Sequence, residues 1–309
     1  MIDVSIIIVS CNTKKYLIDC LNSAIESPCR YMSEIIVVDN ASTDGSCEAV
    51  ASQFPQVTLI KNKENLGFAK ANNIGIRQCQ GRYVCLVNSD VIVLPSCVEK
   101  LVEYMDKNPN VGMTGPRILN PDRTLQVSCR HFPSIWNNLC QTLCLHYLFP
   151  KSRFLSEPFM TYWAHDTIQK VDAVGGMFCM VSRQALDKAG LLDEDFFIYA
   201  EDLDWCKRFD TQNYDIMFFP EAQAIHFGGK SSSNAPIRFY IEMQKADLQY
   251  WTKHYGKFMA TVYKMIVLLR HILRAVARMI QYPFCLSRRG VIRFKIQRCT
   301  ACIKWIFHA

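Results

Sequence analysis

Asp39 and Asp90 each follow a short apolar run, and this spacing could bring two carboxylates to one place. The runs are residues 35–38 and 83–87, and the second leads into Asn88-Ser89-Asp90. Apolar runs of this length, rich in Val and Ile, predict buried strands. Open α/β sheets bind ligands at the carboxyl ends of their strands. The two carboxylates, with Asn12 after the first strand, therefore predict a polar pocket at one rim of a sheet.

Three acidic residues, Glu201, Asp202 and Asp204, follow an aromatic run at residues 196–199. An apolar environment disfavours the charged form of a carboxylate and makes it a better base. Acidic side chains also suit the first turn of a helix, where they complement the helix dipole. The two interpretations are compatible. Glu201 and Asp204 can serve the helix while Asp202 faces a pocket.

Two further segments carry polar groups beside small residues. In residues 65–75, Asn72 offers both a donor and an acceptor, whereas Ala69 and Gly75 suit the packing of a helix on a sheet. His226 precedes Gly228-Gly229, Lys230 and three serines. A single His is most often structural, but this combination predicts a lid near a charged ligand.

These residues need a scaffold, and the apolar pattern supplies one. Predicted strands alternate with helices through the first part of the chain, which indicates βαβ units and a parallel sheet. The strands are expected at 4–10, 34–39, 57–60 and 83–87, and the helices at 14–27, 46–54 and 68–78. Beyond Asp90 we expect helices at 95–108 and 203–209 and strands at 111–119, 170–181 and 216–219, whereas 130–163 is aromatic and irregular.

Composition excludes several classes of protein. The sequence after the first strand, residues 10–15, lacks the Gly-x-Gly-x-x-Gly of nicotinamide-binding folds, and the chain has no phosphate-loop motif. Half of the 309 residues are apolar, without eighteen consecutive uncharged apolar positions or a signal-peptide pattern at the start. Fifteen scattered cysteines predict a reducing cytosol, and Cys299 and Cys302 alone are too few for a zinc site.

The C-terminal part of the chain has a charge of its own. Residues 257–309 contain eleven Lys or Arg and no Asp or Glu, so residues 1–256 carry a net charge of −4. On a helical wheel, residues 257–282 separate into a basic and an apolar face. The basic face holds Lys264, Arg270, His271, Arg274 and Arg278, and the apolar face holds Met265, Leu268, Leu269, Ile272, Leu273, Val276, Met279 and Ile280. This pattern predicts a helix in a membrane interface. A helix used for dimerisation or for domain packing is the alternative, and nucleic acid is disfavoured because the remainder is acidic.

The motifs at residues 37–46, 65–76, 88–90 and 199–204, in this order and spacing, resemble those of family 2 glycosyltransferases. The resemblance covers roughly residues 1–235 and extends to the bacterial rhamnosyltransferase-like branch. It implies a GT-A fold, with a Rossmann-like, mostly parallel central sheet flanked by helices. Residues 1–235 would form the catalytic domain, and residues 236–309 a helical, membrane-associating region.

The resemblance also implies roles for individual residues. Asp39 would contact the base of a nucleotide-sugar, Asp202 would be the catalytic base, and Asp90 with His226 would bind Mn²⁺ or Mg²⁺. The usual Asp-x-Asp metal motif is Asn88-Ser89-Asp90 here, so Asp90 is its single charged ligand. The other expected donor-binding residues are Ser10, Asn12, Asn65, Asn72, Asn88 and Ser89, and the expected acceptor-binding residues are Gly175, Gly176 and Glu201.

We therefore expect an inverting, metal-dependent glycosyltransferase on the cytoplasmic face of the cell membrane. It would move a sugar, from dTDP-rhamnose by branch resemblance, to a lipid-linked glycan in surface polysaccharide synthesis. UDP-linked galactose, glucose or N-acetylglucosamine are alternative donors. An alternative of another class is a non-catalytic, membrane-bound scaffold that binds nucleotide-sugars. The partner expected in addition to the donor, the acceptor and the membrane is a second copy of the chain, in a homodimer.

Overall fold

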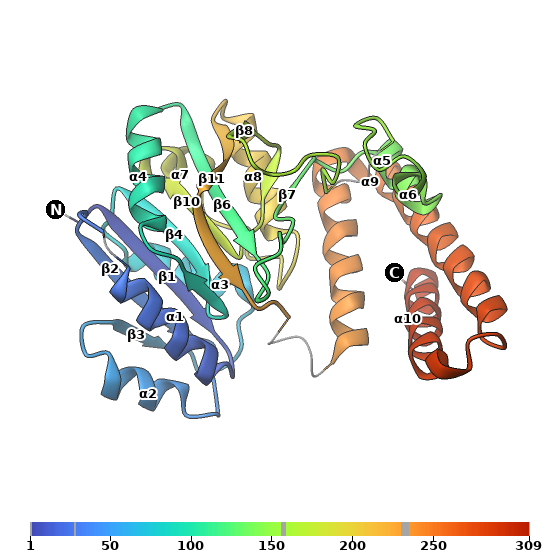
Figure 1. Ribbon diagram of the computed structural model, residues 1–309, viewed down its shortest axis with the longest axis horizontal. Helices are drawn as coiled ribbons and strands as arrows, with labels where there is room; N and C mark the ends of the chain where they lie inside the picture. Colours follow the sequence, from blue (N-terminus) through green and yellow to red (C-terminus); the bar gives the residue numbers. More distant parts are fainter. Residues whose placement is uncertain (1, 28, 156–158, 230–234, 309) are drawn as a thin grey trace. The chain divides into compact units, whose positions relative to one another are not determined.

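The protein divides into two compact units, which the computed structural model describes separately (Figure 1). Unit 1 comprises Met1–Phe132 and Trp163–Ser231, and unit 2 comprises Pro133–Tyr162 and Ser232–Ala309. The structure describes residues 2–27, 29–155, 159–229 and 235–308. Unit 2 therefore includes an internal segment, residues 133–162, in addition to the C-terminal region that the sequence sets apart.

The first half of unit 1 is a parallel βαβ arrangement, as the alternation of strands and helices predicts (Figure 1). Its sheet runs in the order β3-β2-β1-β4, with every pair parallel. The strands are β1 (Val4–Ser10), β2 (Ser33–Asp39), β3 (Thr58–Lys61) and β4 (Tyr83–Asn88), and the helices are α1 (Lys14–Glu26), α2 (Ser46–Gln53) and α3 (Phe68–Gln78).

The second half of unit 1 extends this sheet to nine strands in a mixed pattern. β10 (Phe178–Ser182) lies between β4 and β6 (Val111–Leu119) and is antiparallel to both. β11 (Asp215–His226) runs parallel to β6 and antiparallel to β5 (Val91–Val93) and β8 (Gln169–Lys170). The associated helices are α4 (Cys97–Lys107), α7 (Arg183–Ala189) and α8 (Glu201–Thr211).

The prediction of one strand at residues 170–181 is wrong in detail. The apolar stretch 170–181 forms three short strands in place of one: β8, β9 (Ala173–Val174) and β10. β9 leaves the main sheet and pairs with β7 (Cys129–Arg130). The chain turns at Gly175 and Gly176, which contribute no side chain to a continuous strand, so the apolar run is interrupted before β10 begins.

The central strands are buried because helices cover both faces of the sheet. Successive residues of a strand point to opposite faces. Val37 joins the core cluster that contains Leu17 of α1 and Leu101 of α4. Ile36 and Val38 join a separate cluster with Ala71 of α3. This two-sided burial explains the continuous Val and Ile runs of β1, β2 and β4.

Unit 2 is helical. It contains α5 (Ile135–Thr142), α6 (Leu145–Leu148), α9 (Pro236–Gln281), the short 3₁₀ helix η1 (Leu286–Arg288) and α10 (Arg289–His308). Figure 1 shows α9 bent into two rods, and the break is Gly256, whose φ of 80° and ψ of 168° are not helical. Trp251 stacks on Tyr263 across this break, with ring centroids 5.1 Å apart.

The second rod of α9 has the two faces that the sequence predicts, but its basic face is turned inward. Arg270 and His271 are buried, and the Arg270 guanidinium donates to the Asn138 carbonyl and side-chain oxygens and to Thr142 Oγ1 of α5. The exposed face is apolar, and we call it the α9 stripe. It consists of Met265, Leu269, Ile272, Leu273, Val276, Met279 and Ile280. Among the described residues, no helix has the length and hydropathy needed to span a bilayer.

Candidate active site

The carboxyl ends of β2, β1 and β4 lie side by side. Ser10 is in register with Asp39, and Val9 with Asn88. A chain of hydroxyl groups links two of these ends, because Thr13 Oγ1 lies 3.0 Å from Ser10 Oγ and 2.8 Å from Ser89 Oγ. Thr13, which sequence reasoning did not select, thereby connects two expected donor-binding residues.

Asp39 is buried at the end of β2, and one of its two carboxylate oxygens has no hydrogen-bond partner among the described residues. Its Oδ1 accepts a hydrogen bond of 2.8 Å from the Ser42 backbone, which holds the loop after β2. Its Oδ2 is buried and lacks a hydrogen-bond partner among the described residues. Burial, followed by a hydrogen bond with the Asp39 carboxylate, raises the pKa of the Cys47 thiol to about 11. An unpaired buried carboxylate oxygen is costly. This arrangement suits a ligand that donates a hydrogen bond.

Asn12 and Asn65 shape the loops around Asp39. Asn12 Oδ1 accepts from the Thr43 backbone at 2.8 Å, which ties the end of β1 to the loop after β2. Asn65 Oδ1 accepts from Gly67 N at 3.0 Å and from Asn40 Nδ2 at 3.2 Å. Asn40 is buried and also donates to the Gly67 carbonyl, so it joins the two loops. Asn40 is not among the donor-binding residues that the sequence predicts.

The two asparagines of α3 hold structure together. Asn72 is buried and its Nδ2 donates to the Phe68 carbonyl of its own helix, at 3.0 Å. Asn73 Nδ2 donates to the Leu192 carbonyl at 2.8 Å, and Asn73 Oδ1 accepts from Leu192 N at 3.0 Å. The donor contact expected for Asn72 stays a prediction.

Asp90 and His226 meet where β5 pairs with β11. His226 is in register with Val91, and its Nε2 lies 3.2 Å from Asp90 Oδ1. The other ring nitrogen, Nδ1, lies 2.6 Å from Gln126 Oε1. Both side chains are largely buried, with 10–11% of each exposed.

This pair fits one corner of a divalent cation site. Neighbouring ligands of an octahedral cation bound at about 2.1 Å are about 3 Å apart, close to the separation of Asp90 Oδ1 and His226 Nε2. Among the described residues, no cluster of three or more His, Cys, Asp or Glu could hold a metal. Two protein ligands leave the remaining positions to water and to phosphate oxygens, a common arrangement for Mg²⁺.

Asp202 is held from three sides at the start of α8. Its Oδ2 accepts from Gly176 N at 3.0 Å, and its Oδ1 accepts from Leu203 N and from Arg130 Nη2, each at 2.7 Å. The Gly176 turn is joined to β4, because Asn88 N donates to the Met177 carbonyl. Asp202 therefore lies at the turn that contacts the end of β4, two residues before Asp90.

Glu201 is buried next to Asp202, and its Oε2 is not hydrogen-bonded to any described group. Burial, followed by the charge of Asp202, raises the pKa of Glu201 to about 8. A carboxyl group buried in this way keeps its proton to a higher pH than an exposed one. Asp204 instead accepts from Arg208 Nε within α8, at 2.9 Å, as expected for a residue that serves the helix.

Arg130 and Gln126 are site residues that sequence reasoning missed. Both lie near the start of the aromatic segment whose structure the sequence leaves open, and their partners are distant in the chain. The predicted lid residues Lys230 and Ser231–Ser233 lie outside the described residues.

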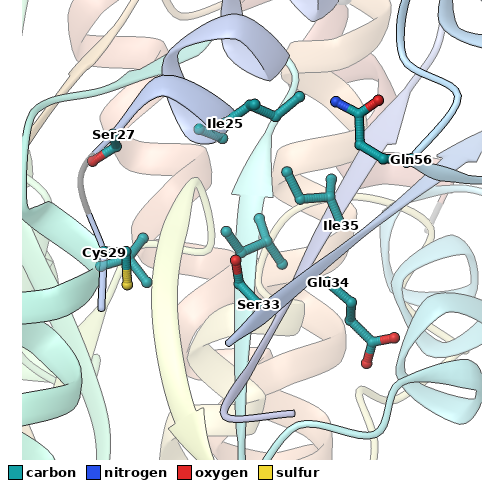
Figure 2. Close-up of a pocket in the computed structure, with 10 residues that line it drawn as sticks. Ile25, Ser27, Cys29, Ser33, Glu34, Ile35 and Gln56 are labelled. Atoms are coloured by element: carbon teal, nitrogen blue, oxygen red, sulfur yellow. The ribbon is translucent and has the colours of Figure 1, made fainter. Parts of the chain in front are cut away.

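A pocket of about 250 Å³ lies elsewhere in unit 1 (Figure 2). Its lining includes Ile6, Ser33, Glu34 and Ile35, which belong to the first halves of β1 and β2. The predicted site residues Ser10 and Asp39 instead stand at the last positions of the same strands. The pocket therefore lies away from the candidate active site.

The nine-stranded sheet and its polar rim define a GT-A glycosyltransferase fold. The fold matches a mannosyltransferase of Pyrobaculum calidifontis, solved with GDP-mannose and Mn²⁺, with a TM-score of 0.59 and 16% identity over 97% of this chain and 84% of that one. It also matches GalNAc-T7, solved with UDP, GalNAc and Mn²⁺, with a TM-score of 0.56 and 16% identity over 82% of this chain and 51% of that one.

Residues 5–167, more than half of the chain, match the model of glycosyl transferase family 2. The chain belongs to this family and is a glycosyltransferase. It is 26% identical to the N-acetylglucosaminyl-diphospho-decaprenol L-rhamnosyltransferase of Mycobacterium tuberculosis over 65% of this chain and 69% of that protein. It is 27% identical to the dTDP-rhamnosyl transferase RfbF of Shigella flexneri over 69% of each. These relatives support the rhamnosyltransferase-like branch.

Proposed function

We propose that this glycosyltransferase moves rhamnose from dTDP-rhamnose to a lipid-linked glycan during surface polysaccharide synthesis, with inversion at the anomeric carbon. The observation that carries the proposal is the gathering of Asp39, Asp90, His226 and Asp202 around connected strand ends. The printed activities of the two rhamnosyltransferase relatives support the donor, and that of the mycobacterial relative supports a polyprenyl diphosphate acceptor.

Each residue has a separate task in the proposed reaction. The free Oδ2 of Asp39 accepts a hydrogen bond from the thymine base of the donor. Asp90 and His226 would hold Mn²⁺ or Mg²⁺, which would supply Lewis-acid stabilisation of the leaving nucleoside diphosphate. Asp202 accepts the proton of the acceptor hydroxyl group while that oxygen attacks the sugar from the face opposite the diphosphate. Glu201, whose pKa is raised to about 8 by burial and then by the charge of Asp202, stands beside this base and contacts the acceptor.

A donor panel tests this proposal. Purified protein is given dTDP-rhamnose, UDP-galactose, UDP-glucose or UDP-N-acetylglucosamine with a polyprenyl-diphospho-N-acetylglucosamine acceptor. Release of nucleoside diphosphate is measured with Mn²⁺, with Mg²⁺ and with EDTA, and NMR gives the anomeric configuration of the product. We expect transfer from dTDP-rhamnose, with inversion, only with a divalent cation. Preference for a UDP-sugar would reassign the donor, and the absence of release with every donor would favour the non-catalytic scaffold.

We also propose that unit 2 docks on the cytoplasmic face of the cell membrane through the α9 stripe. The stripe is a row of exposed apolar side chains, and basic residues such as Arg288, Arg289 and Lys304 occur on the same unit. Apolar side chains suit the acyl region of a bilayer, and Lys or Arg suit anionic headgroups. A homodimer through this surface would bring together two segments that each carry a net charge of +11, which disfavours it.

Flotation with anionic phosphatidylglycerol vesicles tests the docking. Met265→Ser combined with Met279→Ser should weaken binding by at least about tenfold, because burial of a Met side chain contributes about 1.5–3 kcal/mol. The control is Met32→Ser in unit 1, because Met32 and Met265 are 59% and 58% exposed. Equal binding of all three proteins, or a concentration-dependent dimer that the double variant abolishes, would contradict the proposal.

A further inference from the structure

Gln126 contacts His226 on the side of the imidazole ring that faces away from Asp90. Its Oε1 lies 2.6 Å from His226 Nδ1, whereas Asp90 Oδ1 lies 3.2 Å from Nε2. An amide oxygen can only accept a hydrogen bond. If Oε1 faces the ring, Nδ1 must therefore carry a proton. The orientation of the Gln126 amide thus decides which ring nitrogen is protonated.

Backbone carbonyl groups fix that orientation. Gln126 Nε2 donates to the His226 carbonyl at 3.2 Å and to Asn120 Oδ1 at 2.9 Å. Asn120 Nδ2 in turn donates to the Leu125 carbonyl at 3.2 Å and to Thr124 Oγ1 at 2.9 Å. A carbonyl oxygen never donates, so both amides must turn their NH₂ groups toward it. Rotating the Gln126 amide by 180° would place two oxygens against each other at the His226 carbonyl.

The ends of two paired strands, and the loop that follows one of them, carry the three side chains. Asn120 follows the last residue of β6, and the chain reverses so that Gln126 N donates to the Ile118 carbonyl at 2.9 Å. His226 is the last residue of β11, which pairs with β6 on one side and β5 on the other. The contact between Gln126 and His226 is therefore set by the sheet.

We infer that Gln126, oriented by Asn120, is a positioning residue that accepts a hydrogen bond from His226 Nδ1 and thereby directs His226 Nε2 toward Asp90 and the proposed cation. Metal-bound histidines commonly donate their second N–H in this way, and loss of such a partner typically costs 10–100-fold in metal affinity. The inference rests on the metal-binding role proposed above for Asp90 and His226. It adds two amide side chains that touch neither the donor nor the cation.

Nitrogen-15 NMR of the metal-free protein tests the tautomer directly. Histidine is labelled with ¹⁵N, the His226 signals are assigned with His226→Ala, and spectra are recorded near pH 8. We expect a protonated Nδ1 in the wild type, because Gln126 Oε1 accepts from it, and an unprotonated Nδ1 in Gln126→Leu, because Asp90 then favours the proton on Nε2. Gln126→Glu keeps an oxygen at Nδ1 and should retain the proton there. A wild type with an unprotonated Nδ1, or a Gln126→Leu spectrum equal to the wild type, would overturn the inference.

Mn²⁺ affinity, measured by electron paramagnetic resonance with dTDP present, gives a second readout. Gln126→Leu should weaken binding by 10–100-fold, Gln126→Glu should stay within a few-fold of the wild type, and Gln223→Leu is the matched control on β11. The Gln223 side chain donates to the Pro220 carbonyl, at 3.5 Å. If His226→Ala leaves Mn²⁺ affinity unchanged while the tautomer behaves as expected, the proposed metal role fails and the positioning stands. If His226→Ala abolishes binding but Gln126→Leu does not change it, the positioning fails.

Discussion

The carboxylate of Asp202 forms an ion pair with Arg130, whose Nη2 lies 2.7 Å from Oδ1, and each side chain is about one-fifth exposed. The two residues are 72 positions apart in the chain. The pairing of β7 with β9 brings Arg130 to the turn at Gly176. Arg130 thus holds the proposed base in one orientation, together with the backbone N–H groups of Gly176 and Leu203.

Asp202→Asn should reduce kcat by about 10²–10⁴-fold, the usual contribution of general base catalysis, and leave donor binding nearly unchanged. The reason is that an amide oxygen can still accept from Gly176 N but cannot take a proton. Steady-state kinetics with saturating acceptor give kcat, and calorimetry gives the donor affinity. Near-normal turnover would remove Asp202 from the role of base.

Arg130→Met should lower kcat by about 10–100-fold, since a displacement of about 1 Å at a reacting group can cost that much. Arg130→Lys should restore part of the loss, because Lys keeps the charge but not the planar fork of donors. Arg30→Met removes an exposed pair with Glu103 and serves as the control. If the Met and Lys variants are equally impaired in donor affinity but not in kcat, Arg130 binds the donor in place of orienting Asp202.

Asp39→Asn tests whether the free oxygen of Asp39 awaits the donor base. A hydrogen bond to a charged group contributes about 1.5–3 kcal/mol, so dTDP affinity should fall by about 10–100-fold. The free energy of unfolding should stay constant or rise, because a buried charge with an unpaired oxygen is removed. Calorimetry and urea unfolding measure the two quantities. Lower stability with unchanged affinity would make Asp39 a residue that only holds the loop through Ser42.

Glu201 should make the stability of the protein depend on pH. Its pKa is raised from the ordinary value of 4.5 to about 8 in the folded protein. Between these values the unfolded chain binds fewer protons than the folded protein, so the free energy of unfolding falls as pH rises, by up to about 1.4 kcal/mol per unit. The contribution is fully present below pH 4.5 and is lost as pH rises to about 8.

Glu201→Gln should remove this slope and make the variant more stable than the wild type at pH 8. Urea unfolding at several pH values measures it, with Glu64→Gln at an exposed position as the control. A slope that Glu201→Gln leaves unchanged would show that Glu201 is ionised in the folded protein at pH 7.

The parts of the fold that the sequence predicts are those encoded locally. The apolar runs of β1, β2 and β4 define strands buried on both faces, and the polar residues that end them define the rim. Asp39 and Asp90 could be selected because parallel strands place their carboxyl ends together. The antiparallel insertion of β10 has no local signal, because the apolar pattern of a buried strand is the same whether the strand is parallel or antiparallel to its neighbours.

Two features depend on packing between distant segments. The Arg130–Asp202 ion pair depends on the pairing of β7 with β9. Strands of two residues are too short to be predicted from a sequence pattern. The α9 helix separates cleanly into two faces on a wheel, yet the wheel does not say which face another helix covers. Asn138 and Thr142 of α5 accept hydrogen bonds from Arg270, and these bonds offset the cost of burying its charge. The apolar stripe is left exposed as a result.

Gly67→Ala should disrupt the rim, whereas Gly256→Ala should not, although both glycines have nearly the same backbone conformation. Gly67 has a φ of 84° and ψ of 179°, and Gly256 has a φ of 80° and ψ of 168°. Each substitution should cost about 1–3 kcal/mol from backbone strain alone. At Gly67 a Cβ would also lie 2.4 Å from the Phe197 carbonyl oxygen, whereas at Gly256 it would meet no atom within 4 Å.

The crowded carbonyl also accepts from Phe68 N at 2.7 Å, so relief of the clash must break the contact between α3 and the segment before Glu201. Gly67→Ala should therefore lose more stability than Gly256→Ala and also lose donor affinity. Urea unfolding and calorimetry with dTDP compare the two variants. Equal losses of stability with unchanged dTDP affinity would contradict this prediction. They would mean that the segment around Phe197 moves away from the new Cβ at little cost, and that the hydrogen bond from Phe68 N to the Phe197 carbonyl does not position the donor site.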